Sequence, residues 1–70
     1  MKYEPRIEAR REVQRLESDG YKVIDRDSSQ VEGFWKMEHA NGNHIVVTYD
    51  TLPFNHIAIV KNGKIVKFII

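Results

Sequence analysis

The sequence HIAIVKNGKIVKFI, residues 56–69, decides the fold class because it joins two runs of strand-forming residues through Asn62-Gly63. Asparagine and glycine both tolerate positive φ, which a type I′ turn requires at its two central positions. The pattern therefore predicts an antiparallel hairpin with strands at 56–61 and 64–69. The predicted cross-strand pairs are Lys61–Lys64, Val60–Ile65, Ile59–Val66, Ala58–Lys67 and Ile57–Phe68.

A second dipeptide of this kind, Asn41-Gly42, separates strands expected at 31–38 and 44–50. A two-residue loop would place charged side chains opposite core candidates. A three-residue loop over 40–42, with Gly42 in the left-handed conformation, pairs apolar residues with one another, and burial favours that register. The apolar pairs that it predicts are Met37–Ile45 and Trp35–Val47.

The first twenty residues have a different character, since ten of them are charged and the only glycine is Gly20. Pro5 suits the first turn of a helix, and Gly20 suits the position just after its end. We expect a helix over about 4–19, with a narrow buried stripe of Ala9, Val13 and Leu16 at helical spacing. A strand at 21–26 should follow, and the polar residues 25–29 should form a turn.

These elements predict one α+β domain over 1–70. The N-terminal helix packs on one face of a four- to five-stranded antiparallel β-meander that occupies about 21–70. The predicted covered face carries Tyr21, Val23, Trp35, Met37, Ile45, Val47, Tyr49, Ile57, Ile59, Val66 and Phe68. The other face should carry Lys22, Ile24, Phe34, Lys36, Val46, Thr48, Val60, Ile65, Lys67 and Ile69.

The uncovered face is more apolar than a solvent-exposed face of an antiparallel sheet usually is. Val60, Ile65 and Ile69 should form a patch there, with Lys67 among them, and large exposed apolar patches mark interfaces. We expect these four residues to bind a partner. Two alternatives stay open, in which the sheet coils onto itself or the loop at 51–55 folds across this face.

Composition excludes several classes of protein. The chain has no cysteine, and its net charge of +1, from 11 basic and 10 acidic residues, is too balanced to indicate a membrane surface or a nucleic acid. No apolar run approaches the length of a membrane span, and the N-terminus has no signal-peptide pattern. We expect a cytoplasmic protein that has no membrane partner.

Candidate chemistry is sparse. His39, His44 and Glu38 surround one predicted turn, but their spacing matches no zinc motif. Asp25 and Asp27 lack the spacing of a calcium loop. No nucleophile, base and orienting group can be nominated together. We therefore expect no catalytic residues, no bound metal and no cofactor.

Two functions remain. We expect a small non-enzymatic interaction module that self-associates as a homodimer or docks on a larger protein, of the kind found among accessory or phage-type inhibitor proteins. The alternative is a small RNA- or DNA-binding domain, since strand aromatics and lysines bind single strands. The residues of that alternative are Phe34, Lys36, Lys61, Lys64 and Lys67.

Overall fold

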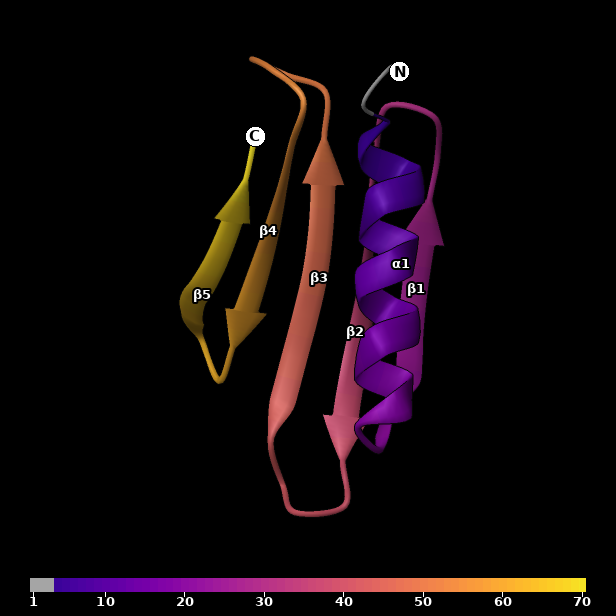
Figure 1. Cartoon of the computed structure of the whole chain (residues 1–70), viewed down its shortest axis with the longest axis vertical. Coiled ribbons are helices and arrows are strands. Elements are labelled where there is room, and N and C mark those ends of the chain that lie inside the picture. Colours follow the sequence, from indigo (N-terminus) through magenta and orange to yellow (C-terminus); the bar gives the residue numbers. More distant parts are fainter. Residues whose placement is uncertain (1–3) are drawn as a thin grey trace.

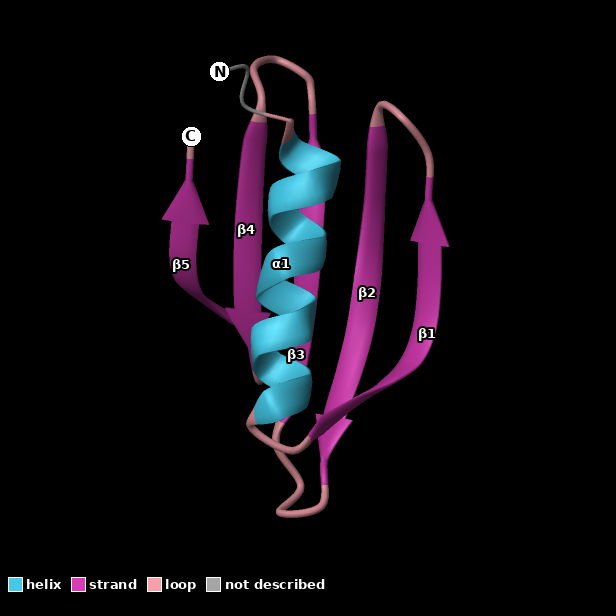
Figure 2. Ribbon diagram, turned by 45° about the vertical axis from the view of Figure 1, so that its right-hand side comes forward, coloured by secondary structure: helices cyan, strands magenta, loops and turns pink. Residues whose placement is uncertain are grey.

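In the computed structural model, which describes residues 4–70, one helix precedes five strands; residues 1–3 of the expected domain lie outside the described part. The elements are α1 (Pro5–Ser18), β1 (Tyr21–Ser28), β2 (Glu32–His39), β3 (His44–Asp50), β4 (His56–Lys61) and β5 (Lys64–Ile69). The strands form one antiparallel sheet in the order β1-β2-β3-β4-β5. The helix lies along one face of this sheet (Figures 1 and 2), and in Figure 2 it lies in front of β3. The predicted α+β meander is therefore confirmed.

The helix begins and ends at the residues that the sequence indicates. Pro5 occupies the first turn, where its missing N–H costs nothing. Gly20 follows the C-cap residue Asp19 with φ of +97°, a conformation that glycine adopts without strain. The predicted stripe of Ala9, Val13 and Leu16 is buried against the sheet.

The core lies between α1 and the sheet, and nine of the eleven residues predicted to face the helix do so. The buried cluster comprises Ala9, Val13, Leu16, Trp35, Met37, Ile45, Val47, Tyr49, Ile57 and Ile59, with Tyr21, Val23 and Ile69 packed against it. Tyr49 is fully buried, and its hydroxyl donates to the carbonyl of Ser29 while accepting from the Ser29 N–H at 3.0 Å. This satisfies the one polar atom that Tyr49 brings into the core.

The β2–β3 hairpin has the predicted register. Met37 lies opposite Ile45, and Trp35 lies opposite Val47. The N–H of Gly42 donates to the carbonyl of His39, and Gly42 has φ of +93°. The three-residue loop is therefore confirmed.

The β4–β5 hairpin departs from the prediction because β5 contains a β-bulge. Val60 lies opposite Ile65 as predicted, but Val66 is then an extra residue, and the following pairs are Ile59–Lys67, Ala58–Phe68 and Ile57–Ile69. One extra residue exchanges the two faces of a strand. Val66 and Phe68, predicted to be covered, are exposed, whereas Ile69 packs against the core. The predicted placement of Lys67 and Ile69 on the uncovered face is wrong for the same reason.

A second bulge interrupts β1. Val23 lies opposite Met37, and the next pair is Asp25–Lys36, so Ile24 is the extra residue. The strand then continues to Ser28, and the turn predicted at 25–29 is wrong in its first four residues. Past the bulge, Arg26 lies opposite Trp35 on the face of the helix, and Asp25 lies on the other face.

Candidate functional site

We call the sheet face opposite α1 the outer face; it carries a connected group of apolar side chains. Val46, Val60 and Ile65 form one cross-strand row, and Ala58 and Phe68 form part of the next. We call these five residues the apolar band. Ile65 is 65% exposed and Phe68 is 49% exposed. The helix cannot cover them, since it lies on the opposite side of the sheet (Figure 2).

The loop between β3 and β4 reaches only one end of the outer face. The Phe54 ring meets the His56 ring edge-on at 5.4 Å, and His56 stacks on Phe68 at the same centroid distance. The Nδ1 atom of His56 lies 2.8 Å from the carbonyl oxygen of Phe54, which holds the imidazole in place. Ile65 stays exposed beyond this row, so the loop does not close the outer face.

The outer face is acidic at one end. A cavity of about 590 Å³ lies there, bordered by the carboxylate residues Asp27, Glu32 and Asp50 and by Phe34 and His56. At the opposite end of the sheet (Figure 1), Lys22 lies on the outer face, whereas Lys61 and Lys64 lie on the helix side, because Lys61 is opposite the core residue Ile45. Glu38 is also there, but it lies opposite Lys22, which balances its charge. The outer face is therefore acidic at one end and balanced in charge at the other.

The four residues predicted to bind a partner do not share a surface. Val60 and Ile65 lie side by side on the outer face. Ile69 packs against the core, and the Lys67 Nζ lies 2.8 Å from Glu12 Oε1 of the helix. Phe68 takes the place on the outer face that the sequence analysis assigned to Ile69.

The residues of the nucleic-acid alternative are also separated. Phe34 and Lys36 lie on the outer face, where their neighbours on β1 are Asp27 and Asp25. Lys61 and Lys64 flank the β4–β5 turn, and Lys67 lies on the helix side. These cations do not form one basic surface with an exposed aromatic row.

The histidines expected not to bind zinc have other contacts. The His39 Nε2 lies 3.1 Å from the carbonyl oxygen of Asp19, and its Nδ1 accepts from the Asn41 N–H at 3.0 Å. Both ring nitrogens of His39 are thus engaged. Over residues 4–70, no three His, Asp or Glu side chains gather as metal ligands would. No helix in that range combines the length and apolarity of a membrane span.

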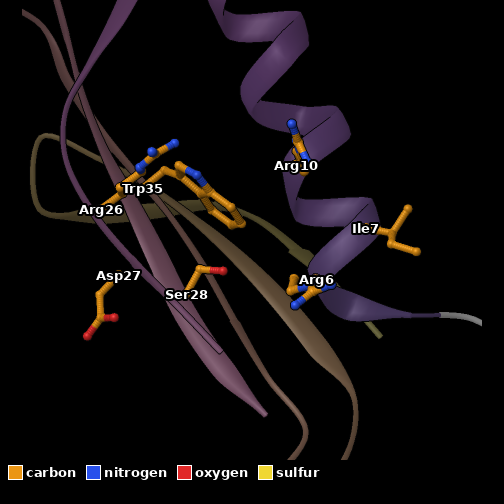
Figure 3. A pocket seen from close by; sticks show the side chains of 7 residues that line it. All are labelled: Arg6, Ile7, Arg10, Arg26, Asp27, Ser28 and Trp35. Carbon is orange, nitrogen blue, oxygen red and sulfur yellow. The ribbon is translucent and has the colours of Figure 1, made fainter. Parts of the chain in front are cut away.

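Sequence reasoning missed a basic cavity between α1 and β1. Arg6 and Arg10 from the helix meet Arg26 from the strand around a space of about 510 Å³, beside Trp35 (Figure 3). The sequence does indicate the two helix arginines of this cavity. Arg6 and Arg10 are one turn apart, and neither is followed three or four positions later by an acidic residue that would pair with it. The position of Arg26 depends on the β1 bulge, which the pattern does not indicate.

Comparisons with protein-family models, with curated proteins and with solved structures find no match to this chain.

Proposed function

We propose that this protein is a small non-enzymatic interaction module that self-associates through the outer face of its sheet. A cytoplasmic location is part of the same proposal. The observation that carries it is the apolar band of Val46, Ala58, Val60, Ile65 and Phe68 on a face that α1 leaves open. Sheets bury an apolar face against a second layer, and two sheets packed face to face are a common solution.

The charges on the outer face determine how a second copy of this chain would pack against it. A two-fold dimer brings the same surface of both copies together. If the axis runs across the strands, the acidic end with Asp27, Glu32 and Asp50 meets the partner's end with Lys22 and Glu38, whose charges balance, and the uncharged bands meet in the middle. An axis along the strands would instead oppose like charges, which is unfavourable. We therefore propose antiparallel, face-to-face packing.

The size of the face sets the strength of the association. Five strands of six to eight residues, spaced about 4.8 Å apart with a rise of about 3.4 Å per residue, give a flat face of roughly 500–600 Å². Standard interfaces bury about 800 Å² per partner. We therefore expect a weak dimer, with a dissociation constant in the micromolar range or above.

Sedimentation across a concentration series tests this proposal with two matched variants. Ile65→Asp places a charge in the apolar band, and Leu52→Asp makes the same change at a residue that is 71% exposed in the β3–β4 loop. We expect Ile65→Asp to abolish dimer formation while circular dichroism shows an unchanged fold. Leu52→Asp should dimerise as the natural chain does. Equal dimerisation of all three proteins would refute the proposed surface.

The antiparallel orientation has its own test. Glu32→Lys reverses a charge at the acidic end, which in the antiparallel dimer meets the partner's balanced Lys22–Glu38 end, so it should change the dissociation constant by less than about twofold. Glu17→Lys, an exposed change on the helix, should leave the dimer unaffected. A tighter dimer for Glu32→Lys would indicate the parallel arrangement instead.

A further inference from the structure

The cavity between the first half of α1 and the strands β1 and β2 is built mainly from hydrogen-bond donors. It is open to solvent on one side and has a volume of about 510 Å³, and besides Asp27 it is lined by Arg6, Ile7, Arg10, Arg26, Ser28 and Trp35. Figure 3 shows the Trp35 ring and the Ser28 hydroxyl between the strand and the helix. This cavity lies on the helix side of the sheet, so it is independent of the outer face.

The three arginines carry uncompensated charge. Within residues 4–70, none of them has a carboxylate oxygen within 4.0 Å. The neighbouring helix arginines differ, since Arg11 pairs with Glu8 at 3.1 Å and Arg15 pairs with Glu12 at 2.9 Å. Glu8 and Glu12 are thus engaged away from the cavity.

Asp27 also borders the cavity, but it does not neutralise it. It lies opposite Phe34 on the outer-face side of β1, and Figure 3 shows its carboxylate directed away from the other side chains. The β1 bulge at Ile24 produces this arrangement. Without the extra residue, Asp25 would lie opposite Trp35, and the bulge places Arg26 there instead.

A further donor with no acceptor among the described residues belongs to Trp35. Trp35 is only 7% exposed, it lines the cavity, and its indole N–H makes no hydrogen bond to any described residue. Indole nitrogen can only donate, and guanidinium groups can only donate. A ligand that supplies acceptor oxygens would pair with these donors in place of water.

We propose that this cavity binds the phosphate group of a nucleoside phosphate. Three guanidinium groups suit a dianion with three terminal oxygens better than a carboxylate, which one arginine can hold through two parallel hydrogen bonds. The cavity is also larger than a phosphate needs, and it falls within the size range of small-molecule sites. The edge of the Trp35 ring provides apolar contact for the nucleoside part.

Fluorescence titration tests the proposal directly, because Trp35 is the only tryptophan in the chain. Adenosine monophosphate is the probe, and adenosine and sodium acetate are the comparison ligands. We expect saturable quenching by the monophosphate, and at least tenfold weaker binding of adenosine and acetate. Arg10→Gln and Arg26→Gln should each weaken binding of the monophosphate at least tenfold. Arg11→Gln, on the same helix but paired with Glu8, should leave it unchanged.

Thermal melts of each variant separate lost binding from lost folding, and all three arginine side chains that are replaced are exposed. Adenosine binding as tightly as the monophosphate would overturn the proposal. So would equal losses for Arg11→Gln and Arg26→Gln, which would indicate nonspecific charge attraction. An absence of quenching at millimolar monophosphate would overturn it as well.

The phosphate could belong to a free nucleotide or to the end of a nucleic acid strand, and a second titration distinguishes them. A single-stranded oligonucleotide with a 5′-phosphate that binds no tighter than the monophosphate indicates a free nucleotide. Binding at least tenfold tighter indicates a strand end, provided that the oligonucleotide without this phosphate binds as weakly as adenosine. If both oligonucleotides bind equally tightly, the terminal phosphate is irrelevant and the proposal fails.

Discussion

Lys67 of β5 donates a hydrogen bond to Glu12 of the helix over 2.8 Å, which joins the last strand to the first element of the chain. The β5 bulge makes this contact possible, because it turns Lys67 toward the helix. Glu12 is also paired with Arg15 and keeps only 12% of its side chain exposed. The far edge of the sheet is thus held to α1 by a partly buried carboxylate.

Stability should depend on the ionisation of Glu12. Burial alone raises the pKa of this carboxyl, but hydrogen bonds from Lys67 and Arg15 outweigh burial and hold the pKa below its usual value. A lowered pKa in the folded state stabilises the protein above the pKa of an unfolded glutamate, about 4.3, and this contribution is lost as the pH falls through the folded pKa.

Urea unfolding of Glu12→Gln across pH measures this contribution. At pH 7 the variant should be about 0.5–1 kcal/mol less stable than the natural chain, since Lys67 and Arg15 are half exposed and water screens them. The difference should shrink below a pH of about 4. Glu8→Gln, which removes a more exposed pair with Arg11, is the control and should have a smaller effect. A difference that is constant from pH 7 to 3 would contradict this account.

Gly33→Ala should destabilise the fold. A Cβ at this position would lie 2.7 Å from the Tyr49 ring and 2.6 Å from the main-chain oxygen of Asp27. Neither neighbour can move away easily, because Tyr49 is packed in the core and Asp27 belongs to β1. Overpacking of this kind costs about 1–3 kcal/mol. Thermal melts measure this loss, with Lys36→Ala on the same strand as the control. Equal melting temperatures of the two variants would contradict the close contact of the added Cβ with Tyr49 and Asp27.

Gly42→Val should also destabilise, but through backbone strain alone. Gly42 has φ of +93°, and an added Cβ would meet nothing within 4 Å. The left-handed region costs an L-residue about 1–2 kcal/mol, and β-branched side chains fit it least well. Asn41→Asp, at the adjacent turn position, should change the melting temperature little. Similar effects of the two substitutions would argue against the three-residue loop.

The turn-forming residues and the alternation of polar and apolar residues predict most of the fold. In the β2–β3 hairpin, charged Lys36 and Glu38 alternate with apolar Trp35 and Met37, so only one register buries the apolar set. The helix was equally clear, since Pro5 and Gly20 bracket one apolar stripe. These elements follow from signals that act over a few residues.

The bulges could not be predicted, and the candidate surfaces depend on them. In β5, apolar residues occur on both faces. A shift of one residue therefore puts Phe68 in place of Ile69 on the outer face, and the alternation of polar and apolar residues does not reveal the shift. Packing against α1 decides between the two, and the Glu12–Lys67 contact joins elements 55 residues apart. In β1, the bulge at Ile24 determines that Arg26, and not Asp25, lies beside Trp35.

The most direct test of self-association through the outer face is methyl NMR of the natural chain on dilution, from on the order of 1 mM to 10 μM, a range that spans a weak dimer. We predict that the methyl signals of Val46, Val60 and Ile65 shift with concentration, while those of Leu52 in the loop and Val13 in the core stay constant. Spectra that do not change with concentration, with a sedimentation mass that stays at 8.2 kDa throughout, would contradict the account.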